Sequence, residues 1–191
     1  VRGRSRQGLA AAALLQDASA PQRHLSAAGG PAGPIRWRNH PGKCLDVRGG
    51  QVQDGAHLQM WDCAEGAPNQ QFSWGMGDGK IRWATHPEYC VDVYNHRDAN
   101  GNVVQLWRCT GSDSDQNFDV PPSGEGHIRW SNHPTKCLDV RDHSTRNGAR
   151  LQIWECKHSN TDQDFLLAGG GRPPQPPPGP TPAPAQPSPT P

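Results

Sequence analysis

The chain has 191 residues, only 32% of them hydrophobic, and its formal net charge is +1. This even balance excludes the basic patch or stripe that nucleic-acid binding needs. No apolar run approaches the roughly 20 residues of a membrane-spanning helix, so the composition predicts neither nucleic-acid binding nor a membrane span.

The first 32 residues form a low-complexity segment rich in Ala, Arg, Gly and Ser. Its apolar stretch 8–15 follows three arginines and precedes Ala18-Ser19-Ala20. This order is similar to that of a degenerate signal peptide with an Ala-x-Ala cleavage site. Because the apolar stretch is short and mostly alanine, we interpret residues 1–32 as a linker, with a signal-like remnant as the alternative.

An internal repeat follows in three copies, 33–78, 79–125 and 126–168. Each copy opens with Gly-x-Ile-Arg-Trp and passes through a His-Pro turn, Cys-x-Asp-Val, an Asx-Gly pair and Gln-x-Trp-x-Cys. It then closes with Gln-x-Phe. These short apolar runs between turn residues predict four strands per copy, twelve in all, without helical periodicity. Copies of about 45 residues are too small to bury a core singly, so we expect one all-β domain in which they close on one another.

The apolar positions that the copies share are expected to form a symmetric common core. These are Ile35, Trp37, Phe72, Ile81, Trp83, Phe118, Ile128, Trp130 and Phe165. Trp74 has no counterpart in the other copies, and we expect it to pack or cap locally.

Six cysteines form three pairs of identical spacing, one pair in each copy. Six cysteines allow 15 pairings, but the repeat makes one disulfide per copy the simplest. The expected bonds are Cys44–Cys63, Cys90–Cys109 and Cys137–Cys156. Reduced structural cysteines and metal binding are the alternatives, although the chain has no C-x-x-C motif. Disulfides predict a secreted or extracellular setting.

The two cysteine-bearing strands of each copy are interpreted as an antiparallel hairpin with a long loop. Gln59 and Trp61 alternate with apolar neighbours, so they share a face. If the disulfide joins opposite positions, Asp46 lies opposite Trp61. The equivalent pairs are Asp92 with Trp107 and Asp139 with Trp154. A carboxylate accepts hydrogen bonds from hydroxyls and an indole covers an apolar C–H face, so the two groups together favour a sugar.

A histidine precedes the proline of each turn, namely His40, His86 and His133. Three symmetric histidines indicate either a metal site on the pseudo-axis or packing of each ring on the tryptophan of its own copy. No carboxylate accompanies them at ligand spacing, which favours packing. We expect no metal and no cofactor.

Residues 169–191 are rich in Gly and Pro, cannot form a core and are expected to be extended polyproline II. We interpret them as a semi-rigid linker. An O-glycosylated stalk or a ligand of a proline-binding domain is the alternative. In each case we expect the domain to belong to a larger chain.

Three in-phase copies of Gly-x-Ile, Cys-[Leu/Val]-Asp-Val, Gln-x-Trp-x-Cys and [Asn/Asp]-Gln-x-Phe resemble the ricin-type β-trefoil lectins and related carbohydrate-binding modules. The resemblance covers roughly residues 33–167. It implies a six-stranded barrel capped by three hairpins, with a sugar pocket in each repeat. The implied pocket residues are Asp46, Gln59, Trp61, Asn69 and Gln70, then Asp92, Gln105, Trp107, Asp115 and Gln116, and finally Asp139, Gln152, Trp154, Asp162 and Gln163.

The first pocket is the best match to the family, because only it has Asn at the position before the last-strand Gln. Asn donates and accepts hydrogen bonds whereas ionised Asp only accepts, so the other two pockets are expected to differ in affinity or specificity. Structural roles are the alternatives: Asp46 could tie down its loop, Trp61 could be core, and Gln70 could satisfy backbone groups of its turn.

The leading functional hypothesis is a non-catalytic, multivalent and monomeric carbohydrate-binding domain. Its candidate ligands include galactose-, GalNAc- and xylose-type sugars, and the sequence does not select among them. The second hypothesis is the binding module of a larger secreted enzyme, and the third is a protein-binding trefoil. The chain has no Gly-x-Ser-x-Gly, Walker or His-Glu-x-x-His motif, so we expect no catalysis within these residues.

Overall fold

The computed structural model describes residues 32–111 and 114–167. These residues form fourteen strands. The strands are β1 (Ala32–Gly33), β2 (Ile35–Trp37), β3 (His40–Val47), β4 (Ala56–Asp62), β5 (Phe72–Ser73), β6 (Arg82–Trp83), β7 (His86–Val93), β8 (Asn102–Arg108), β9 (Phe118–Asp119), β10 (Glu125–His127), β11 (Arg129–Trp130), β12 (Lys136–Val140), β13 (Ala149–Glu155) and β14 (Asp164–Leu167). The expected four strands per repeat are present, with β1 and β10 as short extra strands just before β2 and β11. The interpretations of residues 1–31 and 168–191 lie outside the described residues.

Each repeat also contains two single-turn 3-10 helices, one after the first hairpin strand and one before the last strand. They are η1 (Arg48–Gly50), η2 (Pro68–Gln70), η3 (Tyr94–His96), η4 (Ser114–Gln116), η5 (Arg141–His143) and η6 (Thr161–Gln163). In the described part of the chain, no helix has the length and apolar character that crossing a bilayer requires.

The repeats are joined into one closed unit through their first and last strands. The first strands β6 and β11 pair with the last strands β5 and β9 of the repeats that precede them. The first strand β2 pairs with β14, the last strand of the third repeat, so the third repeat closes back onto the first. This arrangement explains why no single repeat is expected to fold alone.

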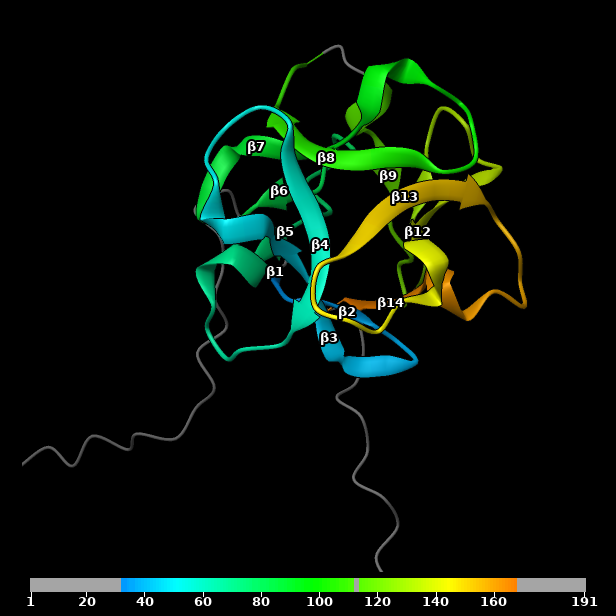
Figure 1. Cartoon of the computed structure of the whole chain (residues 1–191). Helices are drawn as coiled ribbons and strands as arrows, with labels where there is room; N and C mark the ends of the chain where they lie inside the picture. The colour runs from blue at the N-terminus through cyan, green and yellow to red at the C-terminus, as the bar shows by residue number, and fades with distance from the viewer. Residues whose placement is uncertain (1–31, 112–113, 168–191) are drawn as a thin grey trace, which may run out of the picture.

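Three hairpins, β3–β4, β7–β8 and β12–β13, cap this unit. Their second strands also pair with one another, β4 with β8, β8 with β13 and β13 with β4. The three strands therefore meet around the pseudo-threefold axis (Figure 1). In each case the start of one strand pairs with the end of its neighbour, which places every hairpin loop beside the next repeat.

The expected common core is confirmed. All nine shared positions are buried, with exposed fractions of 2% or less. Trp74 is buried in the same core cluster. The turn histidines pack on the tryptophan of their own repeat, with ring centroids 4.2 Å apart for Trp37–His40, 4.4 Å for Trp83–His86 and 4.1 Å for Trp130–His133. The packing interpretation of these histidines is therefore confirmed.

The three expected disulfides are confirmed, but the hairpin register predicted from them is wrong. Cys44 lies opposite Trp61, and Asp46 lies opposite Gln59 rather than opposite Trp61. The same shift occurs in the other two hairpins. Cys63 lies just beyond the end of β4, where its N–H donates to the carbonyl of Gly42. A disulfide needs only a suitable Cα separation. This separation is 5.1 Å here, although the two cysteines are not opposite one another.

Candidate functional site

The repeated aspartate of each hairpin is buried and is held by two glutamine amides. In the first repeat, Gln59 Nε2 donates to Asp46 Oδ1 at 2.8 Å, and Gln70 Nε2 donates to Asp46 Oδ2 at 3.2 Å. Asp92 receives the same two bonds from Gln105 and Gln116, and Asp139 receives them from Gln152 and Gln163. Each oxygen of Asp46 accepts one of these bonds and thus keeps further acceptor capacity in a fixed orientation.

The glutamine at the end of the 3-10 helix before the last strand is a positioning residue rather than an open contact. Besides its bond to Asp46, Gln70 Nε2 donates to the carbonyl of Asp62 at 3.0 Å, and its Oε1 accepts from the N–H of Ala64 at 2.9 Å. Gln116 and Gln163 make the equivalent bonds and are completely buried. Both amide hydrogens of this side chain are therefore used within the protein, and the alternative role proposed for Gln70 is confirmed.

Replacing this glutamine should destabilise the domain. Gln70→Ala leaves the backbone groups of Asp62 and Ala64 without their side-chain partner, so we expect a loss of more than about 2 kcal/mol in the free energy of unfolding. Urea denaturation measures it. Gln71→Ala is the matched control, because its side chain makes only one long bond, 3.4 Å to the carbonyl of Ala67, and should change stability by less than about 0.5 kcal/mol. Equal effects of the two changes would contradict the positioning role.

The tryptophan that follows two residues after the hairpin glutamine is open to solvent. Trp61 is 43% exposed and Trp107 is 39% exposed, while Trp154 is half-buried. They are on the same strand face as the glutamine, because residues two apart share a face. The alternative that Trp61 belongs to the core is therefore wrong. Each hairpin presents a buried, oriented carboxylate and, two residue pairs further along the ladder, an indole that is exposed in the first two repeats and half-buried in the third.

The remaining predicted position lies in the turn before the last strand and differs between repeats. Asn69 in η2 lies beside Gly50, where a Cβ atom would stand only 2.9 Å from Asn69 Oδ1. In the other repeats, Asp115 and Asp162 are buried and each pairs through Oδ2 with Nδ1 of a loop histidine, His96 or His143.

A family model described as the ricin-type beta-trefoil lectin domain matches residues 31–166. The chain belongs to this family. Among curated protein sequences, none matches the chain.

Solved structures agree with this assignment. The designed threefold-symmetric protein ThreeFoil is 25% identical, with a TM-score of 0.61 over 71% of this chain and 96% of its own. The C-half of an earthworm R-type lectin, solved in complex with GalNAc, is 19% identical, with a TM-score of 0.59 over 71% of this chain and 95% of its own. A mosquitocidal holotoxin is 18% identical, with a TM-score of 0.59 over 72% of this chain but only 17% of its own.

In this ricin-type lectin domain, His96 and His143 are residues of the candidate site that the sequence did not predict. Both have φ values in the left-handed region, 54° and 52°, as do the residues before them, Asn95 and Asp142. The first repeat has Gly49 and Gly50 at these positions. Left-handed backbone is costly for residues other than glycine, so the loop histidines are held there by their aspartates. The sequence did contain a sign of this pairing, because the two positions vary together. The repeat with glycine in the loop has Asn69 in the turn, and the two repeats with a loop histidine have Asp115 or Asp162 there.

The pocket carboxylates of the lectin domain are electrostatically unusual. Burial raises the pKa of Asp46, although hydrogen bonds from Gln59 and Gln70 lower it in part. Burial also raises the pKa of Asp139, against hydrogen bonds from its two glutamines and from Asn160. Asn160 Nδ2 donates to Asp139 Oδ2 at 3.1 Å. Burial likewise raises the pKa of Asp162, with the nearby His143 opposing this shift.

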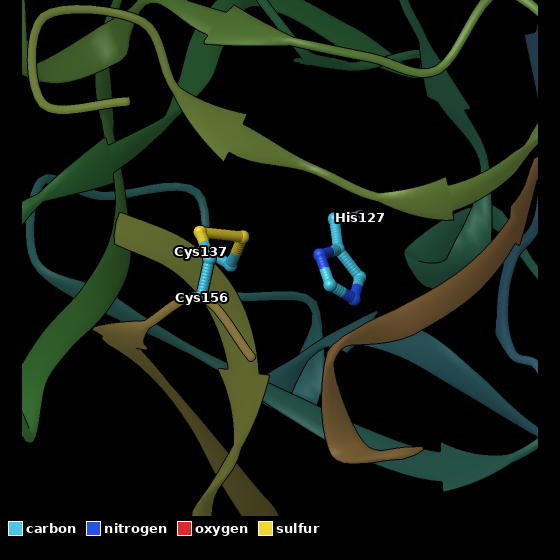
Figure 2. Close-up of side chains that lie close together, drawn as sticks. All are labelled: His127, Cys137 and Cys156. Atoms are coloured by element: carbon cyan, nitrogen blue, oxygen red, sulfur yellow. A yellow bond between two sulfur atoms is a disulfide. The ribbon is translucent and has the colours of Figure 1, made fainter. Parts of the chain in front are cut away.

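A cluster of His127, Cys137 and Cys156 has the spacing of a metal site but not its chemistry. Their potential ligand atoms lie within 4.8 Å of one another. The two sulfurs are, however, bonded to each other as a disulfide (Figure 2), so neither is available as a thiolate. The His127 ring lies 3.3 Å from a carboxylate oxygen of Asp164. This cluster is therefore a packed disulfide beside a histidine.

Proposed function

We propose that this lectin domain is a non-catalytic, multivalent carbohydrate-binding module with up to three sugar pockets. The observation that carries the proposal is the threefold repetition of an oriented, buried carboxylate near an indole that is at least partly open to solvent. The pocket residues are Asp46, Gln59, Trp61 and Asn69 in the first, Asp92, Gln105 and Trp107 in the second, and Asp139, Gln152 and Trp154 in the third. Membership of the ricin-type lectin family supports carbohydrate binding in general.

The chemistry of the pocket suits vicinal hydroxyls on a sugar with one apolar face. The two oxygens of Asp46 keep lone pairs after accepting from Gln59 and Gln70, so they can accept from two neighbouring hydroxyls. The Trp61 indole supplies a flat apolar surface for ring C–H groups. We propose galactose- or GalNAc-type sugars as the ligand class, in keeping with the GalNAc complex of the earthworm lectin.

The same contacts support the absence of catalysis. A glycosidase needs two carboxyl groups about 5–10 Å apart, in different protonation roles. The first pocket has Asn69 where a second carboxylate would stand. In the other pockets the second carboxylates, Asp115 and Asp162, are buried and paired with histidines.

We further propose that residues 33–168 form a module of a larger secreted chain. Three disulfides are consistent with an oxidising, extracellular compartment. The holotoxin shows that a trefoil of this fold can be a small part of a long polypeptide.

A glycan array probed with the full chain tests the proposed function, followed by calorimetry with free galactose, GalNAc and xylose. We expect retention on galactose- or GalNAc-terminated glycans and weak affinity for the free monosaccharide, because each pocket offers one carboxylate and one indole to a single sugar. Failure to retain any glycan, with the protein folded, would contradict carbohydrate binding and favour the protein-binding trefoil.

Mild acidification should remove sugar binding before it unfolds the domain. Asp46 and Asp139 have raised pKa values, so they protonate at a higher pH than ordinary aspartates and lose acceptor capacity for hydroxyls. A carboxyl group whose pKa is higher in the folded than in the unfolded state stabilises the fold at pH values below the unfolded-state pKa. This contribution is lost as the pH rises through the folded-state pKa. Protonating these groups therefore does not itself unfold the protein.

Other groups define the pH window. Hydrogen bonds from Lys43 and Arg82 lower the pKa values of Asp62 and Asp78 in the folded state. The stability that these carboxylates give to the fold is present above their unfolded-state pKa and is lost as the pH falls through their lowered folded-state pKa. The pKa of His127 is lowered by burial, so acidification below about 6.5 costs some stability through this ring. The test measures retention on a galactose matrix and tryptophan fluorescence from about pH 7 to about pH 4. As the pH falls, retention should be lost before the fluorescence reports unfolding. Simultaneous loss of retention and fold would contradict this prediction.

A further inference from the structure

The loop of each hairpin reaches across to the hairpin of the next repeat. Its tip is an aspartate or asparagine followed by glycine, and we name these three pairs the Asx-Gly clasps. They are Asp54-Gly55, Asn100-Gly101 and Asn147-Gly148. The first clasp contacts the second repeat, the second contacts the third, and the third returns to the first.

Each clasp makes hydrogen bonds to the backbone of the two residues on either side of one pocket tryptophan. In the second clasp, Gly101 N–H donates to the carbonyl of Ile153 at 3.0 Å, and Asn100 Oδ1 accepts from the N–H of Glu155 at 2.9 Å. Ile153 and Glu155 are the residues immediately before and after Trp154. The first clasp makes the same glycine and Asx bonds on either side of Trp107, at 2.9 and 2.8 Å respectively. The third clasp makes them on either side of Trp61, at 3.0 and 2.9 Å.

In two of the three clasps the glycine also lies close to the indole, whereas Gly148 of the third lies close to the Gln59 side chain. A Cβ atom on Gly101 would stand 3.7 Å from Cζ3 of Trp154, and one on Gly55 would stand 3.9 Å from Cζ3 of Trp107. The glycines have φ values of 84° and 79°, a backbone conformation that side chains rarely adopt. The tip backbone of one repeat is thus a support for the aromatic surface of the next.

Charge strengthens two of the three clasps. Asn100 Oδ1 also accepts from Lys136 Nζ at 2.8 Å, and Asn147 Oδ1 accepts from Lys43 Nζ at 2.7 Å. The second repeat has Tyr89 at the lysine position, with the Arg108 guanidinium 5.4 Å from its ring centroid.

The repeat that follows each pocket also makes a hydrogen bond to the turn before the last strand of that pocket's repeat. The core Trp37 of the first repeat donates from Nε1 to the carbonyl of Thr161 at 2.8 Å, at the start of the turn that carries Asp162 and Gln163. Trp83 and Trp130 make the equivalent bonds to Pro68 and Ser114. Each pocket is therefore in contact with both neighbouring repeats.

We infer that each sugar pocket is a composite site, in which the Asx-Gly clasp of the preceding repeat positions the stacking tryptophan. This inference rests on the proposed carbohydrate-binding function. The Asx residue acts through the tryptophan and is therefore a positioning residue, not a sugar ligand. Removing its side chain should weaken the pocket of the next repeat and leave the pocket of its own repeat unchanged.

The decisive experiment uses a background with one pocket left. Trp61→Ala and Trp107→Ala together leave Trp154 as the only stacking tryptophan. In this background, Asn100→Ala removes the clasp on Trp154, whereas Asn147→Ala removes the chemically matched clasp on the inactivated first pocket. We expect Asn100→Ala to weaken galactose binding by about three- to tenfold and Asn147→Ala to leave it unchanged. Asn100→Asp should retain binding, because the first clasp naturally carries Asp54.

A second readout separates this inference from the function on which it rests. The indole N–H resonance of Trp154 in a 15N spectrum should shift with Asn100→Ala and not with Asn147→Ala, with or without sugar. Equal effects of the two alanine variants on binding and on this resonance would overturn the composite pocket. Absence of sugar binding in the folded wild type would overturn the proposed function, while the resonance would still decide whether the clasp positions the tryptophan.

Discussion

Reduction of the three disulfides should unfold the lectin domain at physiological temperature. Each bond joins cysteines 19 residues apart, and closing a loop of this size contributes about 3 kcal/mol in the chain-entropy model. A typical domain has a total stability of about 5–15 kcal/mol, so the three bonds together approach the whole.

Calorimetry of the oxidised and the reduced, alkylated protein checks this expectation. Removing one bond by Cys44→Ser with Cys63→Ser should lower the melting temperature by roughly 10 °C. The equivalent double changes in the other repeats should have similar effects, because all three loops have the same length. A reduced protein that melts within a few degrees of the oxidised one would show that the closed barrel is stable without the bonds.

Loss of all three pocket indoles should abolish retention on a glycan surface. Trp61→Ala, Trp107→Ala or Trp154→Ala alone removes one stacking surface, at a cost of about 1.5–3 kcal/mol at that site. The three pockets are related by threefold symmetry and point in different directions, so only a branched or surface-bound glycan engages several at once. Such binding gains about 10²–10⁴ over a single site, and the triple variant loses this gain together with the sites themselves.

Retention on immobilised galactose, compared with calorimetry on the free sugar, measures both effects. The matched control is the triple Trp→Phe variant, which keeps an aromatic surface in each pocket and should keep most of the retention. Retention of the folded triple alanine variant at the wild-type level would show that the pockets do not bind the glycan.

The aspartates are a poorer choice for this test than the tryptophans. Asp46 is only 6% exposed and accepts from Gln59 and Gln70. Asp46→Ala would therefore remove the partner of two amides and reduce stability as well as affinity. Because the indoles are partly exposed, their truncation separates binding from folding.

The sequence by itself determined the features that recur locally in every repeat. The four strands, the common core of Ile35, Trp37 and Phe72 with their counterparts, and the disulfide within each hairpin follow from apolar alternation, turn residues and spacing. These patterns are local in the chain and occur three times, so each copy independently supports the strands, core positions and disulfide predicted from the others. The residues of the proposed pocket were also visible in the sequence, because an aspartate, a glutamine and a tryptophan occupy the same offsets in all copies.

Only the tertiary structure decided which of these groups meet. The register that sets Asp46 opposite Gln59 depends on where β4 ends, because the disulfide lies beyond the strand and does not fix opposite positions. The pairing of His143 with Asp162, and the clasp of Asn100 on Trp154, join residues from different turns or different repeats. The contact of Asn100 forms when three repeats close on one another around a shared axis, and the spacing of residues within one repeat does not encode that closure.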